Sequence, residues 1–149
     1  MTCAQVHKFI NALSFISYET RDRKLVKDFQ MARKKSKLNL KSKLKKYVAI
    51  LTKVVDVEKI ILFGSYANGT AHEFSDIDIA LISSDLDPKK PTFFHNIEIA
   101  KKAKLYDGDL QLFAFPKKRF DKEEGVQGSF IREIKKTGKV IYQKPLVYH

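Results

Sequence analysis

Residues 62–80 read Leu62-Phe-Gly-Ser-Tyr-Ala-Asn-Gly-Thr-Ala-His-Glu-Phe-Ser-Asp-Ile-Asp-Ile-Ala80. This stretch begins with the end of an apolar run, residues 58–64, which has the length of a strand and is stopped by a glycine. It continues into residues 76–82, which alternate polar and apolar residues and then become continuously apolar, as a central strand does. We therefore expect two strands, joined through a turn or one short helical stretch over 65–69.

The glycine and serine after the first strand have properties that suit a phosphate ligand. Gly64 lets the backbone approach a ligand closely, and the N–H groups at the start of a helix attract phosphate. Ser65 adds a hydroxyl donor for a phosphate oxygen. Alone, however, a Gly-Ser pair after a strand is an ordinary turn, and that interpretation stays open here.

Two carboxylates stand at the start of the second strand. Asp76 and Asp78 are two residues apart, so their side chains project from the same face, roughly 7 Å apart at the backbone. Like charges on one face repel unless a cation lies between them. Carboxylate oxygens suit Mg²⁺ or Mn²⁺, and paired metal ions stabilise the attacking and leaving oxygens in phosphoryl transfer. The alternative is a solvent-facing or capping pair.

A third carboxylate on a neighbouring strand would complete such a site. Residues 109–115 form a third apolar run, ended by Pro116. Asp109 opens this run and is the first candidate, with Asp107 as the fallback because the preceding loop leaves the start of the strand open. This carboxylate would hold the metal that activates an attacking hydroxyl and could accept its proton. An Asp that merely belongs to a turn is the alternative.

The remaining elements place these strands in a mixed architecture. Strands that alternate with helices point to the α/β or α+β class. We divide the chain into a basic N-terminal extension, residues 1–37, and one domain, residues 38–149. The apolar periodicity predicts helices over 4–18, 40–55, 92–105 and 129–136, the last one closed by Gly138, and a final short strand over 140–142.

Composition and charge exclude several classes of protein. The apolar runs are too short to cross a bilayer, and a lone Cys3 makes neither an internal disulfide nor a four-ligand zinc site. The net charge is +12, and residues 21–53 carry 13 Lys and Arg against two Asp, a net of +11. This basic segment is either a contact for a polyanion such as nucleic acid or a solvated lysine-rich face. Met31 within it offers a second start of translation.

Together these residues resemble the nucleotidyltransferase superfamily typified by DNA polymerase β. The family pattern is an apolar strand, Gly-Ser, a spacer, Asp-x-Asp on the next strand and a third Asp one strand later. Here Gly64-Ser65 is followed by residues 66–75 and then by Asp76-Ile77-Asp78. That spacing is similar to the minimal nucleotidyltransferases (MNT), many of which are encoded beside a helical HEPN-domain partner in toxin–antitoxin pairs. The resemblance covers about residues 40–143.

The resemblance implies a polymerase β-like fold with a small mixed sheet flanked by helices. It also implies transfer of a nucleoside monophosphate, AMP from ATP, to a hydroxyl with release of pyrophosphate. Two Mg²⁺ ions would take part, with Mn²⁺ as a possible substitute. By position, the catalytic metal ligands would be Asp76, Asp78 and Asp109, and the nucleotide-binding residues would be Gly64, Ser65 and Gly69.

One position departs from the family, and the biological role is open to more than one interpretation. Minimal members often have Arg where this chain has Asn68, and that Arg would contact phosphate. By analogy the chain would be a cytoplasmic antitoxin that modifies a HEPN-domain partner, in a homo- or hetero-oligomer. The alternatives are a catalytically weak module that binds a protein or, through residues 21–53, nucleic acid, and a small-molecule enzyme like those that inactivate aminoglycosides. Enzymes of that kind are usually longer.

Overall fold

The structure is a computed structural model that describes residues 23–148. The amphipathic helix predicted over residues 4–18 lies outside the described residues. The chain divides into two units, with the division between Leu44 and Lys45, and each is described by itself below. The boundary that we predict between residues 37 and 38 stays a prediction.

The described part of the first unit belongs to one long helix. Helix α2 (Arg23–Val54) is 32 residues long and continues into the second unit. The apolar stripe predicts a helix only from Leu40, so the observed helix is longer than expected. The added part contains no Gly or Pro and is rich in Lys and Arg, which favour helix without needing an apolar face. None of the helices over residues 23–148 has both the length and the apolar character needed to cross a membrane.

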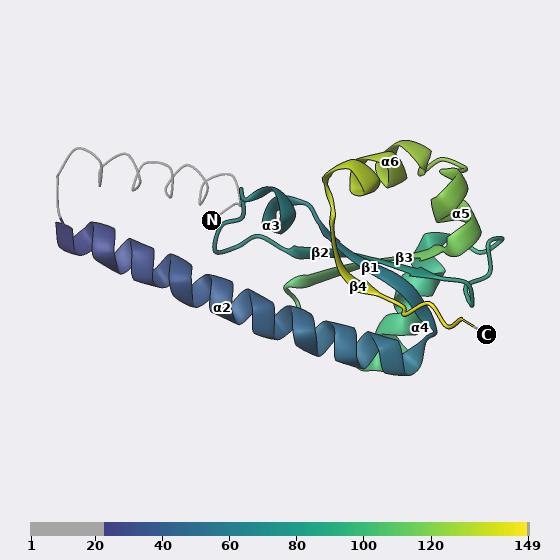
Figure 1. Cartoon of the computed structure of the whole chain (residues 1–149), viewed down its shortest axis with the longest axis horizontal. Coiled ribbons are helices and arrows are strands. Elements are labelled where there is room, and N and C mark those ends of the chain that lie inside the picture. Colours follow the sequence, from purple (N-terminus) through teal and green to yellow (C-terminus); the bar gives the residue numbers. More distant parts are fainter. Residues whose placement is uncertain (1–22, 149) are drawn as a thin grey trace. The chain divides into compact units, whose positions relative to one another are not determined.

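The second unit is built on a four-stranded mixed sheet (Figure 1). Strand β1 is antiparallel to both β2 and β4, whereas β2 and β3 are parallel. The strand order is β3-β2-β1-β4, which confirms the predicted small mixed sheet of the α+β class. The strands are β1 (Val57–Phe63), β2 (Ile77–Ser83), β3 (Leu110–Pro116) and β4 (Lys139–Gln143).

Four further helices connect the strands. Parallel strands need a crossover connection, and α4 supplies it between β2 and β3. Helix α5 is not among the predicted elements, because its six residues cover fewer than two turns and show no apolar period. The helices are α3 (Ser65–Asn68), α4 (Thr92–Ala103), α5 (Lys117–Lys122) and α6 (Gly128–Thr137).

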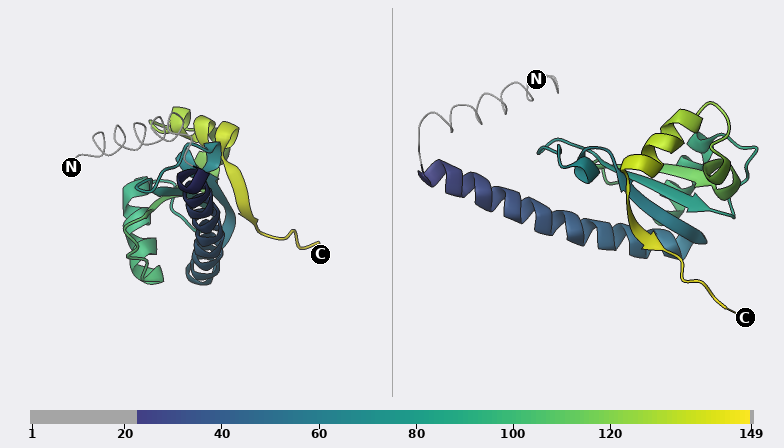
Figure 2. Two further views of the ribbon diagram at one scale, coloured as in Figure 1. Left: turned by 90° about the vertical axis from the view of Figure 1, so that its left-hand side faces the viewer. Right: turned by 45° about the horizontal axis from the view of Figure 1, so that its top comes forward.

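The two faces of the sheet are covered by different helices (Figure 2). Helices α5 and α6 cover one face, while α4 and residues 45–54 of α2 lie on the other. Successive residues of a strand point to opposite faces, so each strand contributes to both layers. The core under α5 and α6 consists of buried Ile61, Phe63, Ala80, Ile82, Phe115, Phe120, Ile131 and Ile134, with Phe113 and Phe130 packed against it.

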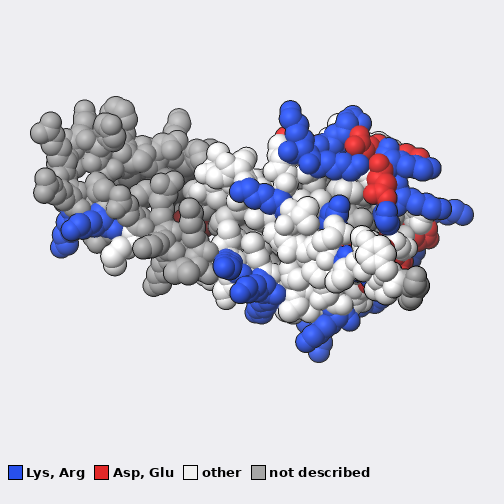
Figure 3. Space-filling model, in the orientation of Figure 1, with Lys and Arg blue, Asp and Glu red and all other residues white. Residues whose placement is uncertain are grey.

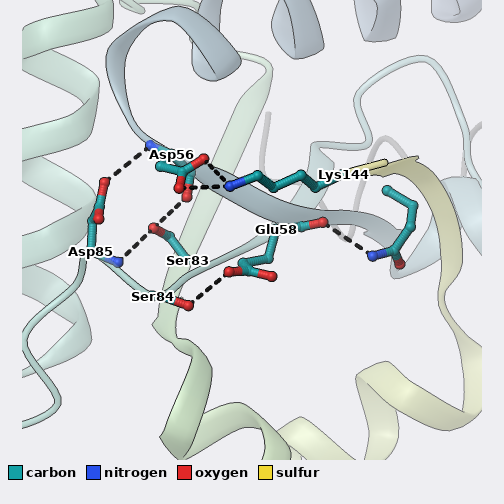
Figure 4. Close-up of polar contacts among 7 residues, drawn as sticks. Asp56, Glu58, Ser83, Ser84, Asp85 and Lys144 are labelled. Atoms are coloured by element: carbon teal, nitrogen blue, oxygen red, sulfur yellow. Dashed lines mark hydrogen bonds and ion pairs between the residues drawn. The ribbon is translucent and has the colours of Figure 1, made fainter. Parts of the chain in front are cut away.

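A polar cluster fixes one end of the sheet, where β1 begins and β2 ends (Figure 4). Both carboxylate oxygens of Asp56 accept hydrogen bonds from Lys144 Nζ, at 2.7 and 2.8 Å. Ser83 Oγ donates to the Asp56 carbonyl at 2.7 Å, and Ser84 Oγ donates to Glu58 Oε1 at 2.7 Å. These contacts tie the chain after β4 and the end of β2 to the start of β1.

Candidate active site

The predicted site residues meet at the other end of the sheet. Strand β1 ends at Phe63, and the antiparallel pairing places Phe63 opposite Asp78 near the start of β2. Strand β3 runs parallel to β2, with Leu110 beside Ile77, so its start lies at the same edge. The end of β1 and the starts of β2 and β3 therefore lie at the same end of the sheet, although they are far apart in the sequence.

Gly64 makes room for a carboxylate at this edge. Its backbone has φ 70° and ψ −153°, a region that is essentially restricted to glycine. A Cβ atom at this position would lie 2.2 Å from Asp78 Oδ2. The glycine is thus required twice, by its backbone conformation and by the carboxylate that packs against it. The sequence indicates the turn, but it does not show this contact.

Asp78 is half-buried and electrostatically strained by its neighbour. Burial raises the pKa of the Asp78 carboxyl above its usual range, and the charge of Asp76 raises it further. Asp76 itself is exposed and lies one residue before β2. A divalent cation would relieve the repulsion within this pair, and carboxylate oxygens are ligands that Mg²⁺ and Mn²⁺ prefer. The donor chemistry of Asp76 and Asp78 therefore fits the metal that the resemblance implies.

Asp109 lies beside this pair without closing a metal site. Its carbonyl accepts a hydrogen bond from the Ile77 N–H at 2.6 Å, which sets the backbone of Asp109 against the start of β2. In the parallel register, however, Gln111 rather than Asp109 lies next to Asp78. Among residues 23–148, no three His, Cys, Asp or Glu side chains are gathered closely enough to hold a metal ion. The predicted roles of the three carboxylates stay predictions.

Asp107, the alternative third carboxylate, is engaged elsewhere. Its Oδ2 accepts a hydrogen bond from the hydroxyl of Tyr47 on α2, and its Oδ1 accepts one from the Asp109 N–H at 3.0 Å. These bonds favour a structural role for Asp107 and leave Asp109 as the better candidate. Sequence reasoning missed the role of Tyr47, because a tyrosine on an apolar helical stripe is explained by core packing alone.

The turn after β1 is held by its own residues. Gly69 ends α3 in the left-handed conformation, with φ 81°, and its N–H donates to the Ser65 carbonyl. Asn68 Oδ1 accepts hydrogen bonds from Thr70 N–H at 3.1 Å and from Thr70 Oγ1 at 2.5 Å. Asn68 is exposed and closes the turn. The nucleotide-binding roles of Gly64, Ser65 and Gly69 stay predictions.

The family described as "Polymerase beta, Nucleotidyltransferase" matches residues 42–145. The "Putative protein adenylyltransferase MJ0604" of Methanocaldococcus jannaschii is 38% identical over 87 residues, which are 58% of this chain and 79% of that protein. The "Putative protein adenylyltransferase MJ1305" of the same organism is 50% identical over 42 residues, so the chain spans only 28% of its length, and the match takes up 28% of this chain.

Among solved structures, a crystal structure of a toxin-antitoxin with AMP-PNP is 28% identical. The match covers 68% of this chain and 73% of that chain, with a TM-score of 0.49.

Proposed function

This chain belongs to the polymerase beta, nucleotidyltransferase family, as predicted, and from that membership we propose that it transfers AMP from ATP to a hydroxyl group of a partner protein. The observation that carries the proposal is the Asp78 carboxylate, which packs against Gly64 beside Asp76 where three strands meet. Two relatives whose names describe protein adenylyltransferases support AMP as the transferred group and a protein as the acceptor.

In the proposed mechanism, this chain binds the triphosphate and orients it. Gly64 leaves the backbone accessible to a phosphate oxygen, and the Ser65 hydroxyl donates a hydrogen bond to it. Asp76 and Asp78, together with Asp109, would hold divalent cations. When bound, such cations neutralise the triphosphate and polarise the α-phosphate. The cations would also offset the negative charges of Asp76 and Asp78, which would explain why two carboxylates that repel each other lie side by side.

The transfer step forms one bond and breaks another. The acceptor oxygen attacks the α-phosphorus, and the bond from that phosphorus to the bridging oxygen of the β-phosphate breaks. Pyrophosphate leaves, and the proton of the acceptor hydroxyl moves to a carboxylate. Asp109 is exposed and its backbone lies against the start of β2, so we assign this proton to Asp109.

The family resemblance points to a HEPN-domain protein encoded by the neighbouring gene, which the chain would silence as an antitoxin. Incubation with labelled ATP, Mg²⁺ and that protein is expected to label the partner. The Asp76→Ala/Asp78→Ala variant should transfer no label. Label from the parent chain and none from the variant supports the proposal, whereas tight binding of the partner without any labelling would overturn it.

A second candidate function is that of a catalytically weak binding module. Asn68 favours it, because this position lacks the cation that minimal members often use. A second feature supports this candidate: Lys and Arg side chains gather over α5 and α6 (Figure 3), where a charged partner would be attracted. Residues 117–139 carry eight Lys and Arg against four Asp and Glu, although several are paired, such as Lys135 with Glu123.

The substitution Asn68→Arg distinguishes these two functions. If the chain is an enzyme with a weakened phosphate contact, the guanidinium should lower the KM for ATP about fivefold, which corresponds to about 1 kcal/mol. The maximal rate should change little. The matched control is Gln143→Arg, which adds the same charge at the opposite end of the sheet and should leave KM unchanged. Equal effects of both variants would contradict a contact at position 68.

A further inference from the structure

The loop that carries Asp109 is held in place by a hydrogen bond from helix α2. Asp109 is exposed and is the last residue before β3. Gly108 precedes it, so the local sequence does little to fix its conformation. The loop is instead folded around Asp107, whose Oδ1 accepts the Asp109 N–H at 3.0 Å and whose carbonyl accepts the Leu110 N–H at 3.2 Å.

The second oxygen of Asp107 is anchored to a rigid element. It accepts the hydroxyl proton of Tyr47, which is only 1% exposed within helix α2. Burial raises the pKa of the Tyr47 phenol, and the hydrogen bond to Asp107 raises it further, so the hydroxyl is a donor at every physiological pH. Asp107 therefore links a buried helical side chain to the backbone N–H of Asp109.

We propose that Tyr47 and Asp107 form a positioning pair that holds Asp109 in place for the transfer reaction. This inference rests on the proposed function and adds residues to it. Tyr47 acts through Asp107 and touches neither substrate nor acceptor. Loss of a residue that orients a metal-binding side chain typically lowers metal affinity or activity by about 10- to 100-fold. Such a pair does not alter the fold. It restricts the range of positions that Asp109 can adopt.

The test compares Tyr47→Phe, Asp107→Ala and the double variant with the parent chain. Two quantities are measured: AMP transfer, and Mn²⁺ binding followed by electron paramagnetic resonance with an α,β-methylene analogue of ATP. We expect Tyr47→Phe to lower kcat and Mn²⁺ affinity each by about tenfold while the KM for ATP stays the same. Because the two residues act as one unit, the double variant should lose no more than Asp107→Ala alone.

The control is Tyr106→Phe, which removes the same hydroxyl from an 80% exposed tyrosine in the same loop. It should leave both quantities unchanged. Thermal unfolding identifies any variant that does not fold, and Tyr47→Phe keeps the buried ring. Parent-like Mn²⁺ affinity and kcat in Tyr47→Phe, additive losses in the double variant, or an equal loss in Tyr106→Phe would each overturn the inference. If the parent transfers no AMP, the proposed function fails, and Mn²⁺ affinity still tests the pair.

Discussion

Asp78→Asn is expected to slow AMP transfer severely and, at the same time, to stabilise the fold. The amide cannot serve as an anionic metal ligand, and loss of several kcal/mol of transition-state stabilisation corresponds to a decrease in kcat of about 10³-fold. Opposite changes in activity and stability are typical of a residue whose environment is adapted to function rather than to folding.

The stability gain follows from the sign of the pKa shift. Burial raises the pKa of Asp78 in the folded chain, so the unfolded chain ionises first as the pH rises. The free energy of unfolding therefore falls as the pH rises from the unfolded pKa through the higher folded pKa. Asparagine resembles the protonated acid. Without metal, the variant should melt above the parent at neutral pH, and at the same temperature as the parent near pH 3, where the Asp78 carboxyl is uncharged like the amide.

Differential scanning calorimetry in EDTA measures this effect, and Mg²⁺ adds a second readout. The parent should gain stability when Mg²⁺ and nucleotide are added, because a ligand that binds only the folded state stabilises it, whereas the variant should gain little. The control is Glu73→Gln, which removes an equal charge from an exposed position in the loop before β2 and should change neither stability nor activity. A lower melting temperature for Asp78→Asn than for the parent at neutral pH would contradict the conclusion that the ionised Asp78 carboxylate destabilises the fold.

Gly64→Ala is expected to damage both the fold and the site. The alanine would be forced into a backbone region that costs about 1–3 kcal/mol, and its Cβ would lie 2.2 Å from Asp78 Oδ2. Either the turn or the Asp78 carboxylate must move. Because a displacement of about 1 Å at a reacting group costs about 10²-fold in rate, we expect that loss in kcat, together with a loss of about 2 kcal/mol in the free energy of unfolding.

The matched control for this substitution is Gly125→Ala. Gly125 also has a positive φ, 80°, but among the described residues no atom other than those of Gly125 and its two chain neighbours lies within 4 Å of a Cβ placed there. It should destabilise the chain by about 1 kcal/mol and leave transfer intact. Urea unfolding and kinetics on the same samples separate the two effects. Similar kinetic losses in both variants would show that backbone strain, and not the contact with Asp78, limits the reaction.

Much of the fold can be predicted from local patterns. The runs around Ile60 and Ile79 are apolar enough to indicate central strands, and Gly64 stops the first of them. Each predicted strand lies within one residue of the observed one at both ends, since pattern and burial agree there. The first half of α2 and the short α5 were not predicted, because a helix without an apolar stripe and a helix of fewer than two turns leave no periodic signal.

The site is harder to predict from the sequence than the fold is, because it depends on how the strands pair with one another. The motif identifies Asp76 and Asp78, but only the strand register shows that Gln111 is the neighbour of Asp78. The choice between Asp107 and Asp109 likewise depends on a hydrogen bond from Tyr47, a residue 60 positions earlier in the chain. No local pattern encodes a contact over that separation, so spacing alone left both aspartates open.

The pairing of the strands also sets the order in which the site can form during folding. Strands β1 and β2 are joined by residues 64–76, so their antiparallel pairing brings Asp76 and Asp78 into place through local contacts. Strand β3 reaches β2 only after α4 has crossed the sheet, and non-local pairings form slowly because chain entropy is lost first. A nascent chain would therefore hold its repelling acidic pair before Asp109, the proposed base, reaches it, and under the proposed mechanism it would become competent for transfer only once the crossover has docked.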